Sequence, residues 1–387
     1  MSLASVRPIS SVPAAAPSPA HPAGSAAVGT SALVYCEGNF GRLDGKTANG
    51  LVRHSERYDI LSVIDSGRAG RDAGEVLDGT PNGIPVHADL AAAVAAVGVP
   101  DFFIFGVAPT SGLLSAAERD VVLDAISSGM NIVNGLHEFL NDDPEFVAAA
   151  LAAGVTMLDV RRPRPKKDLR VFSGRISGVT CPRIAVLGTD GAIGKRTTAT
   201  LLTKALNDRG IRAVMVGTGQ TSLIQGAAYG VAMDAVAPQF CSGEMEAAVV
   251  DAFEVEDPDV IIIEGQGALS HPAYLTSAYI LRGSQPAGVI LQHAPRRVRL
   301  GDFAAYPMPT PESEIHLIQT FADTRVIGIT INHEHMDDDQ ISAAIVRYED
   351  ELGIPATDPL TRPNDRLVDM VVEAFLALGA KATAVAR

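Results

Sequence analysis

The 387-residue chain contains no tryptophan and only three cysteines, and aromatic residues make up just 5% of it. Cys36, Cys181 and Cys241 are scattered along the sequence and form no CxxC pair. An odd, scattered set of cysteines predicts neither a zinc site nor a disulfide framework. We therefore expect buried, unreactive thiols in a reducing cytosol.

Long apolar runs and an excess of basic residues are also missing. No run approaches the ~18 apolar residues that a membrane-spanning helix needs. The 45 acidic and 31 basic residues give a net charge of −14. A negative surface repels nucleic acid and anionic membranes, so neither is expected as a partner. We expect a cytoplasmic, homo-oligomeric protein that holds a small-molecule substrate in a local basic site.

Residues 1–30 are mostly Ala, Pro, Ser and Gly, with almost no large apolar side chains. Such a segment buries too little apolar surface to offset the entropy of ordering it, so we predict a disordered tail. Its prolines, from Pro8 to Pro22, interrupt the continuous apolar region that a secretory signal requires.

From Ala32 onward, short apolar runs alternate with helical patterns. Over residues 31–165 this alternation predicts a mostly parallel sheet with helices on both faces, a Rossmann-like first domain. The basic stretch Arg161–Lys167 then predicts a linker, either a solvated connector or a basic rim for an anionic ligand. The predicted strands are Ala32–Cys36, Asp59–Asp65, Pro85–His87, Phe102–Val107, Asn131–Asn134 and Thr156–Val160, and the predicted helices are Lys46–Arg53, Ala88–Ala96, Ala116–Ser128 and Pro144–Ala153.

A second alternating series over residues 166–387 predicts a P-loop NTPase-like domain, again built on a parallel sheet. Its predicted strands are Ile184–Gly188, Ala213–Gly217, Val260–Glu264, Gly288–Gln292 and Val326–Asn332, and its predicted helices are Lys195–Arg209, Glu244–Phe253, Glu312–Phe321, Asp338–Leu352 and Asn364–Leu378.

The turn between the first strand and helix of this second domain carries the clearest chemistry. Gly188, Gly191 and Gly194 let the backbone approach an anion closely, and Lys195 adds a mobile positive charge. We predict a phosphate-binding loop over residues 188–198, which includes Thr197 and Thr198. Arg196 stands where Mg-nucleotide enzymes place the Ser or Thr that ligates Mg²⁺. The loop therefore suits phosphate binding without metal-assisted cleavage, as for an adenine nucleotide or the phosphates of coenzyme A.

The spacing Gly-Thr-Asp-x-x-x-Gly-Lys resembles the dethiobiotin synthetase and cobyrinic acid synthase branch of P-loop proteins. From about residue 31 to the C-terminus, the chain resembles more specifically a family catalogued as a domain of unknown function. That family includes the D-glutamate N-acetyltransferases of the DgcN type. The matching blocks are Pro165–Leu169, Gly188–Thr198, Val216–Thr221, Ile262–Tyr274 and Asp358–Pro359.

The resemblance implies transfer of an acetyl group from acetyl-CoA to the amine of an acidic D-amino acid, with D-glutamate as the first expectation. A thioester is already activated, so no nucleotide cleavage is needed, in agreement with Arg196. Two alternatives stay open. One is an ATP- and magnesium-dependent ligase or kinase like dethiobiotin synthetase, and the other is a non-catalytic, nucleotide-binding regulatory protein.

Three residues are candidates for catalysis. Glu264 ends an apolar strand, where side chains of an open α/β sheet face the ligand. It could act as the general base for an attacking ammonium, bind that ammonium, or orient the P-loop. His271 is a candidate proton relay or a structural hydrogen-bonding residue. Asp190 lies inside the P-loop, where a substrate ammonium would account for a carboxylate beside phosphates.

Further candidates for binding follow other predicted strands. Arg296 and Arg297 could hold substrate carboxylates in bidentate fashion, or form a solvated basic turn. Asn332 ends a predicted strand. In the resembled P-loop branch, an Asn at the end of that strand recognises adenine, so Asn332 is a candidate cofactor residue. Four more residues offer hydroxyl, amide or backbone donors to the substrate, namely Thr218, Gln220, Thr221 and Tyr274.

Two other patterns predict no ligand. His333 and His335 precede three acidic residues, but their spacing and the start of a helix favour capping over a metal site. The turn Gly38–Gly41 lacks the full dinucleotide-binding motif. Lys46 and Thr47, which follow it, could contribute to an anion site or simply begin a helix.

Overall fold

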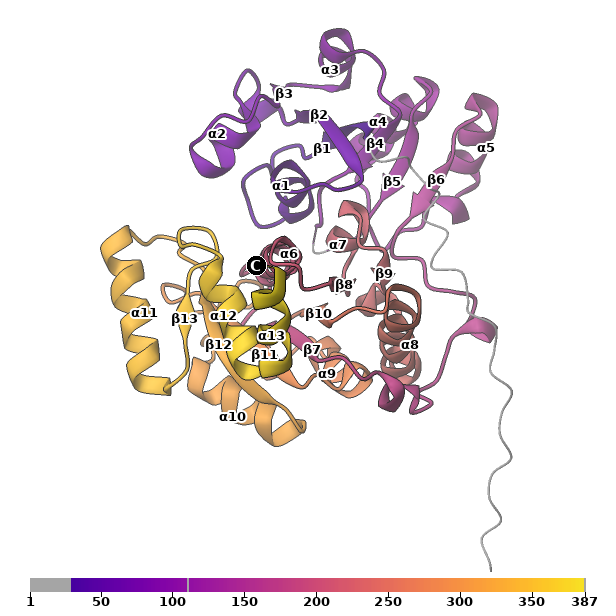
Figure 1. Cartoon of the computed structure of the whole chain (residues 1–387). Coiled ribbons are helices and arrows are strands. Elements are labelled where there is room, and N and C mark those ends of the chain that lie inside the picture. The colour runs from indigo at the N-terminus through magenta and orange to yellow at the C-terminus, as the bar shows by residue number, and fades with distance from the viewer. Residues whose placement is uncertain (1–28, 110, 386–387) are drawn as a thin grey trace, which may run out of the picture.

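The computed structural model describes residues 29–109 and 111–385. Two parallel α/β sheets lie one above the other, with helices packed around each (Figure 1). The predicted fold class, a Rossmann-like domain followed by a P-loop domain, is confirmed. The tail predicted over residues 1–30 lies almost wholly outside the described residues. Among the helices of the described part, none is both long and apolar enough to cross a bilayer.

The first sheet has six parallel strands in the order β3-β2-β1-β4-β5-β6. Each predicted strand of this domain is present. The short helix α2 was not predicted; it begins after Asp72, whose carboxylate accepts a hydrogen bond from the Glu75 N–H. The strands are β1 Thr30–Tyr35, β2 Tyr58–Ile64, β3 Val86–His87, β4 Phe102–Phe105, β5 Asn131–Asn134 and β6 Met157–Asp159, and the helices are α1 Lys46–Arg53, α2 Ala73–Asp78, α3 Leu90–Val97, α4 Ala116–Ser127 and α5 Pro144–Ala153.

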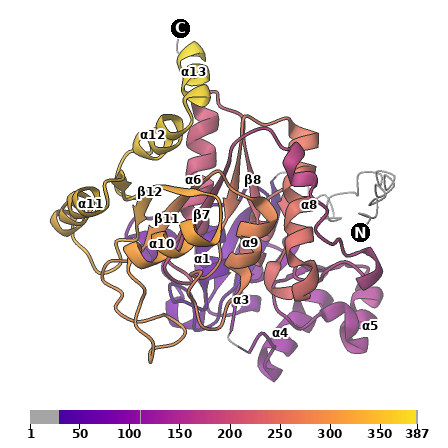
Figure 2. The ribbon, with the colours of Figure 1, turned by 90° about the horizontal axis from the view of Figure 1, so that it is seen from below.

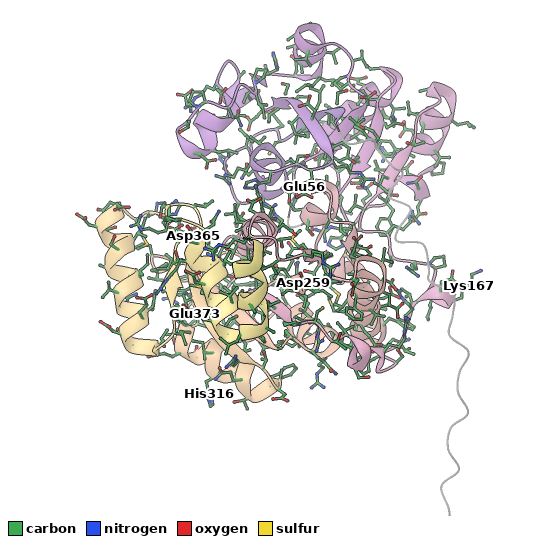
Figure 3. All side chains as sticks on the ribbon, viewed as in Figure 1. Glu56, Lys167, Asp259, His316, Asp365 and Glu373 are labelled. Atoms are coloured by element: carbon green, nitrogen blue, oxygen red, sulfur yellow. The ribbon has the colours of Figure 1, made fainter. Side chains whose placement is uncertain are left out.

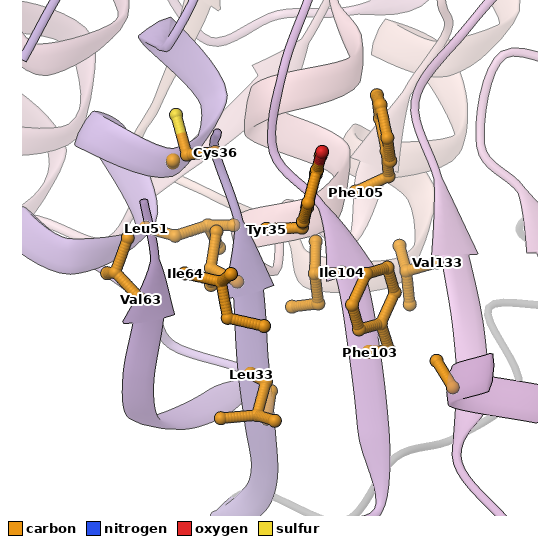
Figure 4. Close-up of a cluster of buried hydrophobic side chains, with 14 of the residues drawn as sticks. Leu33, Tyr35, Cys36, Leu51, Val63, Ile64, Phe103, Ile104, Phe105 and Val133 are labelled. Carbon is orange, nitrogen blue, oxygen red and sulfur yellow. The ribbon is translucent and has the colours of Figure 1, made fainter. Parts of the chain in front are cut away.

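The core of the first domain forms around β1, β2 and β4. Leu33, Ile64 and Phe103 are fully or almost fully buried there (Figure 4). The Tyr35 ring stacks on Phe105, with 5.3 Å between ring centroids. Because helices cover both faces, these strands are apolar on both sides. Burying each large side chain of this kind stabilises the fold by about 1.5–3 kcal/mol.

The second sheet has seven parallel strands in the order β13-β12-β11-β7-β10-β8-β9. Alternate residues of β7 point to opposite faces. Ile184 and Val186 share a core with residues of α6 and α12, whereas Ala185 and Leu187 share another core with residues of α8 to α11. Figure 2 shows α6 and α12 on one side of the sheet and α9 and α10 on the other. The strands are β7 Arg183–Gly188, β8 Ala213–Gly217, β9 Tyr229–Gly230, β10 Val260–Glu264, β11 Gly288–His293, β12 Arg325–Ile331 and β13 Ala356–Thr357, and the helices are α6 Lys195–Asp208, α7 Gln220–Gln225, α8 Pro238–Glu256, α9 Thr276–Ser284, α10 Pro311–Phe321, α11 Asp338–Leu352, α12 Asp365–Ala374 and α13 Leu376–Val385.

Some helices of the second domain differ from prediction. The helix expected over Glu244–Phe253 begins earlier, at Pro238, where proline is tolerated because a first-turn N–H needs no helical partner. The single helix expected over Asn364–Leu378 is two helices, which break at Phe375 (φ −131°, ψ 80°). Helices α7 and α9 were not predicted.

The two domains pack tightly through α1 and α7. Ile224 of α7 belongs to the core of the first domain, and Thr47 and Thr221 share a hydrogen bond of 2.9 Å. The Glu56 N–H donates to the Gln225 carbonyl oxygen at the boundary between the domains (Figure 3). The predicted linker is anchored at its first residue, because Arg161 is buried and donates to the Gly135 carbonyl oxygen at 2.6 Å.

Candidate functional site

The candidate site lies where the carboxyl ends of the two sheets face each other. In the first sheet the strand order reverses between β1 and β4, and in the second it reverses at β7, whose end leads into the P-loop. Ligands of open α/β sheets bind at such reversal points. Contacts cross the interface here, since a Cβ on Gly301 would lie 3.8 Å from the Leu43 side chain. The interdomain site, as we call it, comprises residues 43–47, 188–195, 217–221, 264–274 and 296–303.

Residues at the ends of β11 and β12 fix the conformation of the P-loop. Gly194 has a left-handed backbone (φ +99°), which favours glycine, and a Cβ on Gly188 would lie 2.9 Å from the Gln292 carbonyl oxygen. The Lys195 ammonium donates to the Asp190 carbonyl oxygen within the loop. Burial lowers the pKa of Lys195 to about 8. Asn332 donates to the Ile193 carbonyl oxygen at 3.0 Å, so its amide supports the loop.

Asp190 lies in a network of charges rather than free beside the loop. Its carboxylate is buried and accepts from the Arg297 guanidinium at 2.9 Å and from the Gly301 N–H at 2.8 Å. Arg297 also binds both carboxylate oxygens of Glu334, at 2.8 and 2.9 Å, and the Gly191 carbonyl oxygen at 3.0 Å. A substrate role for Asp190 or Arg297 stays a prediction, and it would require exchange of these bonds. Arg296 is exposed.

The threonine hydroxyls that follow Lys195 are only partly available. Thr198 is buried and donates to the Gln292 side-chain oxygen at 2.6 Å. Thr330 donates to the same oxygen at 2.5 Å. Thr197 is half-buried on the first turn of α6. The Thr198 hydroxyl therefore ties α6 to the sheet.

Arg196 points to the domain interface. Its guanidinium donates to the side-chain oxygen of Gln225, and a Cβ on Gly50 of α1 would lie 2.6 Å from its terminal nitrogen. The Gln225 amide in turn donates to the carbonyl oxygens of Gly50 (2.7 Å) and His54, at the C-terminal end of α1. Burial lowers the pKa of Arg196 to about 10. The residue that replaces the usual Mg²⁺ ligand thus joins the P-loop helix to the first domain.

Glu264 is a buried carboxylate at the end of β10, beside the P-loop strand. One of its oxygens, Oε2, accepts from the Thr218 N–H at 2.8 Å and from the Ser222 hydroxyl at 2.6 Å. Among the described residues, no hydrogen bond reaches the other oxygen, Oε1. The carboxylate is fixed in orientation while Oε1 stays available to a ligand.

His271 is buried on the segment that follows Glu264. Its Nδ1 accepts from the Ala273 N–H at 3.2 Å, which places the ring proton on Nε2. Nε2 is buried and has no hydrogen-bond partner among the described residues. The ring stacks on Tyr274 (4.3 Å between centroids), whose hydroxyl donates to Asp302 at 2.8 Å. Burial lowers the pKa of His271, so the imidazole is a neutral donor at neutral pH.

The remaining predicted residues line up along the start of α7. Thr218 is fully buried, and its hydroxyl donates to the Glu264 carbonyl oxygen and accepts from the Gln266 amide at 2.8 Å. Gln220 packs against Gly135 of the first domain, where a Cβ would lie 3.3 Å from its side chain. Thr221 binds Thr47 across the interface. These residues therefore support Glu264 and the domain contact.

No group of three or more His, Cys, Asp or Glu within residues 29–109 and 111–385 is arranged to hold a metal ion. His333 pairs with the buried Asp358 at 2.6 Å. Asp337 caps α11, accepting from the Gln340 N–H at 2.9 Å. The three cysteines are buried, and burial raises the pKa of the Cys241 thiol to about 11.

A separate cavity of about 560 Å³ lies near the linker. It is lined by residues 158–164 of the first domain and 226–232 of the second, with other residues around them. Neither the P-loop nor Glu264 lines it. We place the candidate site at the P-loop, because the carboxylate, imidazole and lysine gather there.

Comparison with known proteins agrees with this arrangement. Residues 170–368 match the family model described as "Domain of unknown function (DUF1611_C) P-loop domain", and residues 66–163 match "Domain of unknown function (DUF1611_N) Rossmann-like domain". The chain belongs to this family. A crystal structure of a DUF1611 family protein from Anabaena variabilis has a TM-score of 0.82 and 32% identity, covering 89% of this chain and 99% of that one.

Two curated proteins that are similar to this chain are named for an enzymatic activity. A D-glutamate N-acetyltransferase of Tritonibacter scottomollicae is 33% identical over 274 residues, which is 69% of this chain and 79% of the relative. A D-glutamate N-acetyltransferase of a Pseudoalteromonas species is also 33% identical, over 273 residues, 69% of this chain and 80% of the relative. This similarity supports an acetyltransferase activity.

In this family member, several site residues escaped the sequence analysis. Ser222 and Gln225 lie on α7, a helix too short to show a periodic pattern. Asp302 and Phe303 reach His271 and Tyr274 from another loop. The sequence signal for α7 was the pair of glycines that bound it, Gly219 and Gly226.

Proposed function

We propose that the protein is an N-acetyltransferase that moves an acetyl group from acetyl-CoA to the amine of an acidic D-amino acid, D-glutamate first. The observation that carries the proposal is Glu264. Its carboxylate is buried at a strand end beside the P-loop, with one oxygen fixed by Thr218 and Ser222 and the other available. A positioned carboxylate of this kind can accept the proton that an ammonium must lose before it attacks a thioester.

The P-loop supports coenzyme A as the ligand. Its backbone N–H groups and the start of α6 suit a phosphate, and Lys195 adds charge. The position after Lys195 offers no hydroxyl to Mg²⁺, because Arg196 is turned to Gln225 and Gly50. A thioester needs no metal-assisted phosphate cleavage, so the missing hydroxyl does not hinder acetyl transfer.

The proposed step balances as follows. Glu264 takes a proton from the α-ammonium, and the free amine nitrogen attacks the acetyl carbonyl carbon. A C–N bond forms and the C–S bond breaks, the second proton of the nitrogen passes to the sulfur so that coenzyme A leaves as a thiol, and Glu264 then releases its proton to water. The Nε2–H of His271, buried and without a partner among the described residues, is suited to donate to the developing oxyanion.

Identity of the amino acid rests on the relatives. Two proteins at 33% identity are named D-glutamate N-acetyltransferase, and this chain covers 79% and 80% of their lengths. A dicarboxylate also suits an acidic protein that carries local lysine at the site.

The experiment gives purified protein acetyl-CoA and a panel of D- and L-amino acids, and follows thiol release and product mass. We expect N-acetylglutamate from D-glutamate, with one thiol released per product. Parallel reactions contain Mg-ATP instead of acetyl-CoA. Magnesium-dependent ADP release would favour the ligase alternative. Tight nucleotide binding without turnover of any amino acid would favour the regulatory alternative.

A further inference from the structure

A lysine of the first domain, Lys46, lies within electrostatic reach of the P-loop lysine, Lys195. Lys46 begins α1, at the reversal point between β1 and β4. Its backbone is fixed on both sides. The Ala108 N–H donates to the Asp44 carbonyl oxygen at 2.7 Å, and the Ala48 N–H donates to Gly106 at 3.2 Å. The next residue, Thr47, bonds to Thr221 of the second domain at 2.9 Å. The start of α1 is thereby held in place against the interdomain site.

The Lys46 ammonium has no hydrogen-bond or ion-pair partner among the described residues. Lys46 is exposed at the surface, yet the protein around its ammonium removes enough water to lower its pKa. Lys204, on the outer face of α6, pairs instead with Asp208 at 2.7 Å. Lys46 is therefore a cation placed in the site and left uncommitted.

The charges within electrostatic reach of Lys46 come from both domains. Arg161, Asp44, Asp302 and Glu264 all act on it, and Lys46 in turn acts on Lys195. Asp302 is bound by the Tyr274 hydroxyl, and Arg161 is paired with Asp234. Lys46 and Glu264 are near enough to interact, but they form no ion pair. A ligand with both a carboxylate and an ammonium would satisfy both groups.

A second observation indicates that a polar ligand is missing from the same place. The Nε2 of His271 is buried and has no partner among the described residues, and the ring lies within electrostatic reach of Lys195 and Asp302. Arg297, the arginine predicted to hold a carboxylate, already makes four hydrogen bonds to protein oxygens. Positive charge for a substrate carboxylate must therefore come from another residue.

We infer that Lys46 is a carboxylate subsite, which binds the side-chain carboxylate of the acidic amino acid and sets the preference for acidic over neutral substrates. The inference rests on the proposed function. Lys46 belongs to the opposite domain from Glu264, so a substrate that touches both spans the interface. Its α-ammonium lies at Glu264 and its side chain extends to Lys46. The phosphates of the acyl donor stay on the P-loop side, with Lys195.

The test replaces Lys46 by Met, which keeps an unbranched side chain only one atom shorter and removes its charge. Activity is measured on D-glutamate and on D-glutamine, which differs only in lacking the side-chain charge. We expect K46M to lower kcat/KM for D-glutamate by about 10- to 100-fold, the loss of one charge-assisted hydrogen bond. The value for D-glutamine, and the KM for acetyl-CoA, should change less than about twofold. K46R should restore part of the preference, and K204M is the matched control.

Three results would overturn the inference. An unchanged ratio of the two substrates would remove Lys46 from recognition. An equal loss of kcat/KM on both substrates would indicate that Lys46 binds the α-carboxylate. A raised KM for acetyl-CoA would indicate that Lys46 binds the phosphates of the acyl donor. Calorimetry of D-glutamate binding without acetyl-CoA separates this inference from the proposed function. The wild type could bind D-glutamate without acetylating any amino acid. If K46M then binds D-glutamate more weakly, the proposed acetyltransferase function is wrong but the carboxylate subsite at Lys46 is supported.

Discussion

Glu264 holds its position through one carboxylate oxygen and leaves the other for chemistry. Because a glutamine at this position keeps an acceptor for Thr218 and Ser222, E264Q should fold normally but lack a base. We expect kcat to fall by about 10²-fold or more, with the affinity for acetyl-CoA kept. Stopped thiol-release assays and calorimetry measure the two quantities. The exposed Glu312, changed to Gln, is the control. Full activity in E264Q would assign the proton transfer to another group.

Lys195 gives the P-loop a charge that depends on pH. Burial lowers its pKa to about 8, and only the protonated form attracts phosphate. The free protein therefore loses this positive charge as pH rises through about 8, and the affinity for coenzyme A should fall by up to about tenfold between about pH 7 and pH 9. K195R stays charged and should flatten the profile. Calorimetry across this range makes the measurement, and the same slope in K195R would place the titration elsewhere.

At the scale of elements, a buried amide joins α7 to the end of α1. Gln225 donates to the carbonyl oxygens of Gly50 and His54 and accepts from Arg196. Q225A leaves these partners unsatisfied, so we expect the free energy of unfolding to fall by about 2 kcal/mol. Urea denaturation measures the change. The exposed Gln239, changed to Ala, should have almost no effect. An equally small change in the free energy of unfolding of both variants would show that water replaces the hydrogen bonds of the Gln225 amide.

The contact between β10 and β7 leaves no room for a side chain after Glu264. A Cβ on Gly265 would lie 2.2 Å from the Val186 carbonyl oxygen, and a backbone atom in a central strand has little freedom to move. G265A should destabilise the protein by about 1–3 kcal/mol, as overpacking does, and should reduce activity by displacing Glu264. The same change at Gly178, which has nothing within 4 Å, is the control. Melting temperature and thiol release test both effects, and a neutral G265A would contradict the strand geometry.

At the scale of the whole molecule, the two domains should unfold as one unit. Ile224 of the second domain is buried in the core of the first, so the first core is incomplete without the second domain. Scanning calorimetry should show a single transition, with matching calorimetric and van't Hoff enthalpies. I224A should cost about 2–4 kcal/mol and separate the transitions. I280A, inside the second core, should destabilise without separating them. Two transitions in the wild type would refute this account.

The sequence by itself determined the strands of the first sheet, most helices and the P-loop, and it determined all strands of the second sheet except β9 and β13. Local hydrophobic periodicity fixes β5 Asn131–Asn134 and α11 Asp338–Leu352 to the residue. Glycine spacing after an apolar strand fixes the loop at Gly188. These signals depend only on neighbours along the chain. Helix α7 gave no such signal, because six residues between two glycines are too few to show a period.

The tertiary structure alone decided what the site residues do. Arg196 reaches Gln225 and Gly50, because α1 packs over the start of α6. Arg297 is bound by Asp190 and Glu334, which lie far from each other in the sequence. Lys46 comes within electrostatic reach of Lys195 because the reversal points of two separate sheets meet at one interface. Sequence spacing carries no information on such contacts, since they depend on how whole sheets pack against each other.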